Sequence, residues 1–239
     1  MTQFVTLDEV AHADLRVEVG YADSKQALVN QTLVFPTEFI QLAKEYPIFF
    51  RRSDEGKFYA IVLLGLDREE NLYLQGAKWN ARYVPAVIER GPFALAMVTP
   101  SDAHTGAAQS AIQIDTEDAR VSRDHGERIF LPHGGQTPYL EAISNVLNRI
   151  HIGASIVDHF FAQLEAFDLI EPITLQANLS DELQYTVPDL FTISKERMTQ
   201  LSGDQLHELN QMGLLEHCFA IMSSADNFSK LVDLKAMKA

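Results

Sequence analysis

The stretch TPYLEAISNVLNRIHIGASIVDHFFAQLEAFD, residues 137 to 168, determines the fold class. Thr137 is a typical N-cap, Pro138 suits the first helical position, and Glu141 adds negative charge to the first turn. Apolar residues then recur at alternating spacings of three and four, at Leu140, Ile143, Leu147, Ile150, Ala154, Val157, Phe161 and Leu164. This spacing predicts one helix from about 138 to 168, roughly 45 Å long, which Glu171-Pro172 ends. Its broad apolar stripe favours packing against several neighbours, and a homodimer interface on the same helix stays an alternative.

The residues before this helix are predicted to form short helices and strands. A polar turn with Gly56 separates two apolar, β-rich runs, which is typical of a hairpin, and the second run is apolar enough to be covered on both faces. The expected elements are a short helix from Pro36 to Pro47, strands at 48–50 and 58–64, a third strand of the same sheet at Leu72 to Leu74, and a strand pair at 93–98 and 111–114 joined by a loop from Thr99 to Ser110.

The residues after the long helix are predicted to form a small sheet followed by helices. Ile173 to Leu179 alternates apolar and polar residues, Ser180 to Glu182 reads as a turn, and 183–187 and 190–193 extend a second, small antiparallel unit. Ser194 and Ser202 are cap candidates, and Gly213 separates two short helices. The sequence therefore predicts an α+β fold with a mostly antiparallel sheet, one long central helix (about 138–168) and a helical C-terminus.

The length and composition fit a single compact domain of residues 1–239. The change of character at residue 137 allows a subdivision into a sheet-rich part, 1–136, and a part, 137–239, with the long helix, the small sheet and the C-terminal helices. The formal net charge of -14 disfavours nucleic acid as a partner. Residues 150–194 carry seven acidic residues and no Lys or Arg, which indicates either a solvated acidic face or a docking surface for a basic protein. With a single cysteine, no apolar run long enough for a membrane span and no secretory signal, we expect a soluble cytoplasmic protein.

Two short patterns offer chemistry. His125 and Glu127 have the His-x-acid spacing of non-haem iron sites, which need a second, distal histidine; the alternative is a charged surface turn. Cys218 follows His217 and is either a nucleophile activated by histidine or a buried, unreactive thiol. The glycine patterns of phosphate-binding and dinucleotide-binding loops do not occur in the sequence. No cofactor is predicted, and iron at His125 and Glu127 is the alternative.

Four segments between residues 38 and 224 form a recognisable succession: EFIQLAKEYPIFF, VLLGLDREENLYL, WNARYVPAVIERGPFAL and DLFTISKERMTQLSGDQLHELNQMGLLEHCFAIMSS. This succession resembles the SapC family of proteobacterial proteins. The family motif falls on Asn71, Leu72, Trp79, Tyr83, Pro85, Pro92 and Phe93. We expect Trp79 to be a core anchor. Asp189 departs from the pattern, because the family has glycine before two aromatic residues there.

The resemblance implies an accessory protein and supplies no catalytic residues. Members of the family resemble accessory proteins encoded near halogenase-like and cupin-like proteins, a setting that suggests peptide or glycan uptake or modification. Three functions follow as hypotheses: a non-catalytic cytoplasmic accessory or interaction protein, an iron-dependent enzyme that modifies peptides or small molecules, and a surface-layer-associated protein. Metal analysis of the purified protein discriminates the first two, and cell fractionation tests the third.

Overall fold

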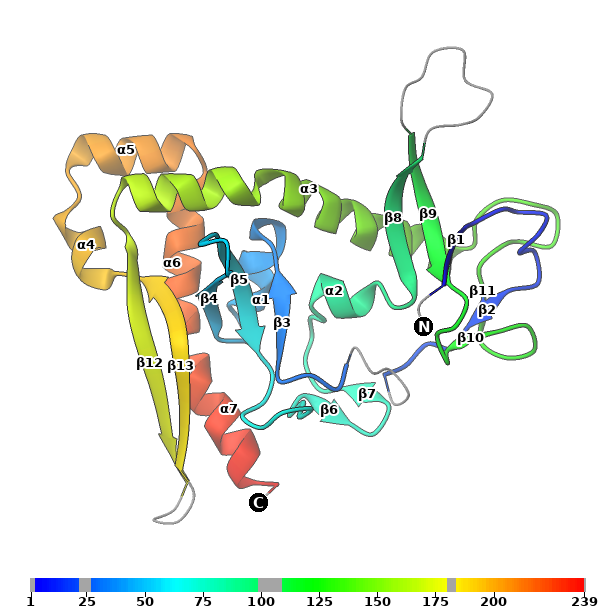
Figure 1. The fold of residues 1–239 in the computed structure, drawn as a ribbon, viewed down its shortest axis with the longest axis horizontal. Helices are drawn as coiled ribbons and strands as arrows, with labels where there is room; N and C mark the ends of the chain where they lie inside the picture. Colours follow the sequence, from blue (N-terminus) through cyan, green and yellow to red (C-terminus); the bar gives the residue numbers. More distant parts are fainter. Residues whose placement is uncertain (1–2, 22–26, 99–108, 180–183, 239) are drawn as a thin grey trace.

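The computed structural model describes residues 3–21, 27–98, 109–179 and 184–238 (Figure 1). The predicted turn from Ser180 to Glu182 lies outside these ranges. Residues 99–108 of the predicted loop from Thr99 to Ser110 lie outside them as well. The fold is α+β, as predicted, with antiparallel sheets, one long helix and a helical C-terminal part.

The largest sheet has five antiparallel strands in the order β12-β13-β4-β5-β3. Its strands are β3 (Gln31–Val34), β4 (Ile48–Arg52), β5 (Phe58–Leu63), β12 (Ile170–Asn178) and β13 (Gln184–Ile193). The predicted hairpin is confirmed as β4 and β5, and β5 is buried along nearly its whole length between β4 and β3. The short helical stretch before the hairpin forms η1 (Pro36–Glu38) and α1 (Phe39–Leu42).

The predicted second, small antiparallel unit is confirmed as the pair β12 and β13, but it does not form a sheet of its own, because β13 joins the first sheet through the pair Phe191 and Phe50. Phe191 packs edge-on against Phe58 at 5.0 Å between ring centroids, so aromatic packing accompanies the pairing. Asp189 has a positive φ of 58° at a register shift between β12 and β13. Left-handed backbone at a bulge favours glycine, which explains why glycine suits this position in the family that the sequence resembles.

The long helix is confirmed as α3 (Pro138–Ala166). Thr137 caps it, since its side chain accepts a hydrogen bond from the Leu140 amide. The helix ends earlier than the predicted stop at Glu171-Pro172: Asp168 has a φ of 54°, and the Leu169 amide donates to the Leu164 carbonyl. Pro172 instead lies within β12, opposite Phe191.

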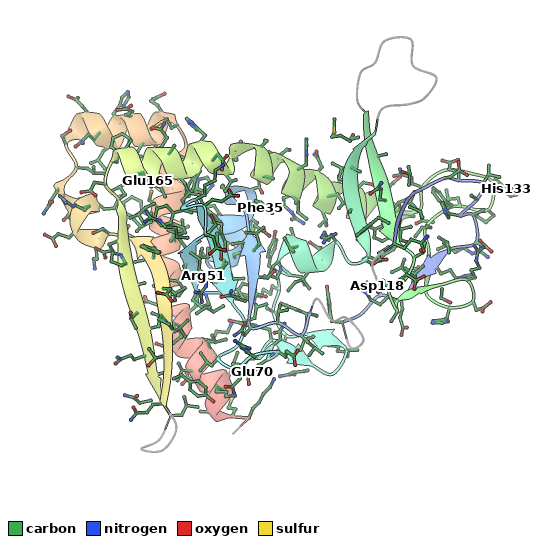
Figure 2. The ribbon with its side chains drawn as sticks, viewed as in Figure 1. Phe35, Arg51, Glu70, Asp118, His133 and Glu165 are labelled. Carbon is green, nitrogen blue, oxygen red and sulfur yellow. The ribbon has the colours of Figure 1, made fainter. Side chains whose placement is uncertain are left out.

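A smaller part of the molecule surrounds the first half of α3. It contains a sheet of order β1-β9-β8 and a sheet of order β10-β2-β11. Their strands are β1 (Phe4–Thr6), β2 (Arg16–Val17), β8 (Phe93–Val98), β9 (Gln109–Asp115), β10 (Val121–Ser122) and β11 (Glu127–Arg128). Leu140, Ile143 and Leu147 of α3 belong to a hydrophobic core here, whereas Phe160, Phe161 and Leu164 belong to the core of the larger sheet. Figure 2 accordingly places Asp118 and His133 far from Glu165, at the other end of α3.

The predicted third strand of the main sheet is wrong. Leu72 and Tyr73 lie in a turn, and β6 (Leu74–Gln75) pairs only with β7 (Lys78–Trp79) in a two-stranded ribbon. Both turn residues are nevertheless fully buried. Their backbone amides are satisfied in the interior, since the Leu72 amide donates to the Leu64 carbonyl and the Tyr73 amide to the Asn71 side chain. Burial in a turn gives the same apolar pattern in the sequence as burial in a strand. After this ribbon, α2 (Ala86–Glu89) leads into β8.

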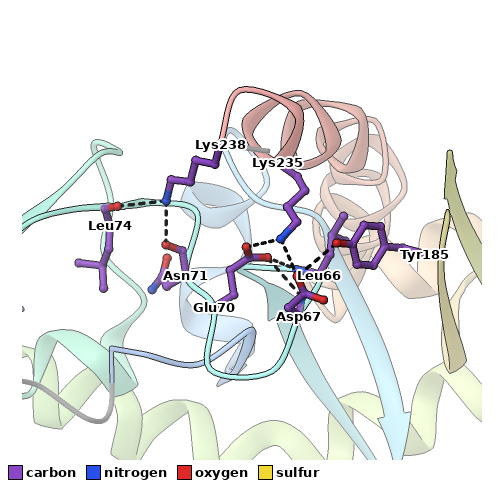
Figure 3. Close-up of polar contacts among 8 residues, drawn as sticks. All are labelled: Leu66, Asp67, Glu70, Asn71, Leu74, Tyr185, Lys235 and Lys238. Atoms are coloured by element: carbon purple, nitrogen blue, oxygen red, sulfur yellow. Dashed lines mark hydrogen bonds and ion pairs between the residues drawn. The ribbon is translucent and has the colours of Figure 1, made fainter. Parts of the chain in front are cut away.

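The C-terminal part is helical, as predicted. It comprises α4 (Lys195–Gln200), α5 (Gly203–Gln211), α6 (Leu214–Ser224) and α7 (Asn227–Ala236). Ser194 and Ser202 cap α4 and α5, and Gly213, with a φ of 70°, separates α5 from α6. Lys235 fixes α7 to the segment after β5, because its Nζ lies 2.5 Å from an Asp67 oxygen and 2.6 Å from a Glu70 oxygen (Figure 3).

Gly153 allows the middle of α3 to approach the turn that follows β3. A Cβ at this position would lie 2.4 Å from Phe35 Cβ and 2.7 Å from Thr37 Oγ1. We expect Gly153→Ala to lower the free energy of unfolding by about 1 to 2 kcal/mol through overpacking, measured by urea denaturation. Gly203→Ala is the control, since nothing lies within 4 Å of its Cβ position, and it should leave the free energy unchanged or slightly higher. Equal effects of the two substitutions would contradict the close approach of α3.

Candidate binding groove beside an edge strand

Strand β8 is an apolar strand at the edge of its sheet. Its sequence, Phe93 to Val98, reads FALAMV and contains no charged residue or proline. It pairs with β9 on one side, and in the part of the chain that the structure describes no strand pairs with its other side. Edge strands in soluble proteins usually carry charges, proline or a covering segment that prevents pairing with another chain. An apolar edge is therefore a candidate surface for a partner.

Backbone contacts identify which groups of β8 face this edge. The Pro92 carbonyl accepts a hydrogen bond from the Asp115 amide. The backbone amides and carbonyls of even-numbered residues of β8 therefore point toward β9, and those of odd-numbered residues point toward the open edge. The backbone groups of Phe93 already bond to Arg90. The Phe93 amide donates to the Arg90 carbonyl at 3.2 Å, and the Phe93 carbonyl accepts from Arg90 Nη1 at 2.5 Å. Leu95 and Met97 are left, and among the described residues no backbone group bonds to their outward amides and carbonyls.

Two hollows border β8 and meet at Leu95 and His151. The first, of about 430 Å³, lies between β8, α2, α3 and β3, which is itself the edge strand of the larger sheet. The second, of about 470 Å³, lies between the face of the small sheet and the first half of α3. Together they follow α3 from Leu140 to Ala154, about 21 Å at 1.5 Å per residue, which matches roughly six residues of extended chain. We call the two hollows with the open edge of β8 the β8 groove.

The lining of the β8 groove combines apolar and polar side chains along its length. Leu33 and Met97 are exposed at 39% and 61% although both are large apolar side chains. The polar lining residues are Glu9, Arg90, Ser110, Gln136, Ser144, Asn148 and His151. Such a lining can bury apolar side chains while the open edge supplies backbone donors and acceptors.

Arg90 places one positive charge at the end of the first hollow. Burial, and then the nearby Arg120, hold the pKa of its guanidinium below its ordinary value. Within the described ranges, no carboxylate lies at ion-pair distance from Arg90. Arg90 was not among the functional residues predicted from the sequence. The sequence feature that could have indicated it is that Arg90 and Glu89 interrupt the otherwise apolar stretch VPAVIERGPFALAMV, residues 84–98.

Two family-motif residues, Trp79 and Tyr83, belong to a hydrogen-bond network next to this groove, and the other motif residues are buried around it. Trp79 Nε1 donates to the Tyr46 hydroxyl at 2.6 Å, which donates to the Tyr83 carbonyl at 2.5 Å. The Tyr83 hydroxyl donates to Glu38 Oε2 at 3.0 Å, and the Ala86 amide donates to the same oxygen at 2.9 Å. Asn71 Nδ2 donates to the Ala27 carbonyl, and Leu72, Pro85, Pro92 and Phe93 are buried. These contacts join the segment from Asn71 to Phe93 to the turn at Phe35 to Tyr46, so the motif residues position α2 and β8.

Glu38 is the centre of this network and, like Arg90, was not predicted from the sequence as a functional residue. Its side chain accepts from the Phe35 amide as well as from Tyr83 and Ala86, and it is 1% exposed. Burial raises the pKa of its carboxyl, and the three donors partly offset this effect. In the sequence Glu38 reads only as the acidic residue of a helix start, a position that is usually solvated.

The predicted metal ligands lie elsewhere: His125 is in an exposed turn between β10 and β11, and Glu127 is the first residue of β11. His125 Nδ1 is 3.0 Å from the Ser122 hydroxyl and its Nε2 is 3.8 Å from Glu18. Glu127 is exposed in β11. Within residues 3–21, 27–98, 109–179 and 184–238, no group of three or more His, Cys, Asp or Glu side chains is arranged to hold a metal ion.

Cys218 is fully buried in α6, and burial raises the pKa of its thiol to about 12. His217 does not activate it, because both ring nitrogens face carbonyl oxygens, those of Gly213 at 2.8 Å and Pro36 at 3.1 Å. A thiol with a raised pKa holds little nucleophilic thiolate near neutral pH.

The acidic segment 150–194 receives basic partners from outside it. Asp158 pairs with Lys57, Glu165 with Arg52 and Asp168 with Arg197. These ion pairs are exposed, and they reduce the charge that the segment presents along α3.

Comparison with known proteins identifies a family. Residues 7–231 match the SapC family. No curated protein and no solved structure matches the chain. Among the helices that the structure describes, none combines the length and the apolar character needed to cross a membrane. Because the match covers nearly all of the 239 residues, the chain belongs to the SapC family.

Proposed function

We propose that the protein is a non-catalytic accessory protein that binds an extended, mostly apolar polypeptide segment in the β8 groove. The observation that carries this proposal is the open, uncharged edge of β8 at Leu95 and Met97, next to two hollows. Only a polypeptide backbone offers donors and acceptors at the repeat that a strand edge requires. The length of the groove suits about six residues in extended conformation.

The charges of the groove specify the segment further. Arg90, without a carboxylate partner among the described residues, suits an acidic side chain or a chain terminus at one end of the bound segment. Apolar side chains would fill the hollows beside Leu33 and Leu95. We place this protein in the cytoplasm, in a system of peptide or glycan uptake or modification, as the family resemblance suggests. Halogenase-like and cupin-like proteins are the first partners to test.

We expect Met97→Lys to weaken binding of the partner at least tenfold, because a charge on the edge strand opposes addition of an apolar strand. The partner is identified by co-purification from the native cell, and its affinity is then measured by calorimetry with purified proteins. Ile156→Lys is the matched control: Ile156 is an exposed apolar residue of α3 outside the two hollows, and its substitution should leave the affinity unchanged.

Hydrogen exchange separates strand addition from other modes of binding. In the free protein the amides of Leu95 and Met97 should exchange fast, and those of Ala94 and Ala96, which turn toward β9, should exchange slowly. Strand addition protects the first pair. A partner that leaves Leu95 and Met97 unprotected, tolerates Met97→Lys and is released by salt would instead use the acidic segment 150–194, and would refute the β8 groove as its site.

A further inference from the structure

A third cavity shares no lining residue with the β8 groove. It has a volume of about 220 Å³. Segment 17–21, the residues after α2 and the beginning of α3 line it. Its lining includes Val17, Tyr21, Gly91, Arg120, Tyr139 and Val146.

Arg120 directs unused hydrogen-bond donors into this cavity. The residue is 5% exposed, and Asp118 holds it by two bonds, from Nε at 2.9 Å and from Nη2 at 2.7 Å. A guanidinium has five N–H groups, so three are left, including both on Nη1. Nη1 lies 3.5 Å from the Cβ position of Gly91, which also lines the cavity, and no acceptor for it occurs among the residues that the structure describes. A buried cation with free donors favours an anionic acceptor.

Two phenol groups add neutral donors to the same cavity. The Tyr21 and Tyr139 hydroxyls make no hydrogen bond to another described residue, and burial raises the pKa of each phenol to about 12. Both phenols therefore stay protonated near neutral pH. The positive charge of Arg120 acts on both, in the direction that lowers their pKa values, so the three groups lie within electrostatic reach of one another.

The other lining residues restrict the charge and shape of a ligand. Val17, Ile143 and Val146 are buried apolar residues that form part of the wall. Glu18 and Glu89 are also lining residues; Arg149 holds the Glu89 carboxylate at 2.8 Å, and Glu18 Oε2 lies 3.8 Å from His125 Nε2. Two further negative charges would repel a dianion such as phosphate more than a single carboxylate.

We propose that this cavity is a binding site for a small monocarboxylate with a short, branched apolar chain. The carboxylate accepts hydrogen bonds from Arg120 and from the two tyrosine hydroxyls, and the apolar chain lies against Val17, Ile143 and Val146. This site is independent of the proposed polypeptide binding, because the two sites have no lining residue in common.

Isothermal titration calorimetry of the full chain with isovalerate tests the proposal. We expect saturable binding with one site per chain, and at least tenfold weaker binding of isovaleramide and of inorganic phosphate. The amide has the same shape without the charge, and phosphate has the charge without the apolar chain. Absence of isovalerate binding at millimolar concentration, or equal binding of the amide, would overturn the proposal.

Variants connect the binding to this cavity. Tyr139→Phe should weaken isovalerate binding about fivefold through loss of one hydrogen bond, and Ala142→Leu should abolish binding by filling the cavity. The double substitution Asp118→Asn with Arg120→Gln removes both charges of the buried pair together, so that no carboxylate is left buried alone, and should abolish the preference for the acid over the amide. Arg123→Gln is the control, because Arg123 is an exposed arginine paired with Asp14. Unchanged affinity in folded Tyr139→Phe and Ala142→Leu would place the ligand elsewhere and refute the site.

Discussion

Glu38→Ala is expected to lower the free energy of unfolding by about 3 to 5 kcal/mol, which is a large fraction of the stability of a typical protein. The substitution leaves the Phe35 amide, the Ala86 amide and the Tyr83 hydroxyl without their acceptor in a part of the molecule where Glu38 is 1% exposed. Each unpaired buried donor costs about 1 to 3 kcal/mol. Urea denaturation at pH 7, followed by circular dichroism, measures the effect.

The control for Glu38 is Glu171→Ala, in the exposed part of β12, which should change the free energy of unfolding by less than about 0.5 kcal/mol. A loss below about 1 kcal/mol for Glu38→Ala would show that water replaces the carboxylate and that the network is dispensable.

The same residue makes stability depend on pH with a defined sign. Because burial raises the pKa of Glu38 above its ordinary value of 4.5, the native state holds this proton more tightly than the unfolded state. The stability that this tighter proton binding gives the native state is fully present below pH 4.5 and is lost as the pH rises through the raised pKa of Glu38. Glu38→Gln cannot titrate, so the advantage of the wild-type protein over this variant should shrink as the pH rises from 4 to 7. A constant difference would contradict the raised pKa.

Lys235→Met is expected to lower the free energy of unfolding by about 2 to 3 kcal/mol and to loosen α7. The side chain of Lys235 is 12% exposed, and its ammonium neutralises Asp67 and Glu70 together (Figure 3). Burial opposes the charge of Lys235, but the hydrogen bonds to both carboxylates more than offset burial and raise its pKa. Removal of the ammonium leaves two adjacent carboxylates, one of them well covered, without a counter-charge.

The design for Lys235 includes a control and a rescue. Lys230→Met removes an exposed lysine of the same helix, 3.9 Å from Glu45, and should cost about 0.5 kcal/mol or less. Combination of Lys235→Met with Asp67→Asn and Glu70→Gln should restore most of the stability, because no carboxylate is then left unpaired. Hydrogen exchange of α7 provides a local measurement. If the rescue fails while α7 stays protected, the loss comes from packing of the lysine chain and not from charge.

Features that depend on near neighbours were predictable from the sequence. The start of α3 follows from Thr137 and Pro138, and its length follows from apolar spacing that repeats within each turn. The hairpin of β4 and β5 and the caps at Ser194 and Ser202 are local in the same sense. Each of these predictions is confirmed.

Features that depend on distant contacts were not predictable. The apolar alternation of β12 and β13 indicates a hairpin but not the sheet that it joins, and the burial of Leu72 in a turn resembles burial in a strand. The candidate sites have the same limitation. FALAMV reads as a strand, but its position at an edge depends on strand order, and nothing near Asp118 and Arg120 in the sequence indicates that the pair is buried.

The pairing of Phe50 with Phe191 also sets an order of events during synthesis. The two residues are 141 positions apart, 191 minus 50, so β4 leaves the ribosome long before its neighbour β13 exists. At about 5 to 20 residues per second, this interval lasts roughly 7 to 28 seconds. Throughout that time the edge of β4 that β13 later pairs is open. Ile48, Phe49 and Phe50, which are fully buried in the folded protein, then lack part of the sheet around them. The protein should therefore depend on chaperones until β13 closes the sheet.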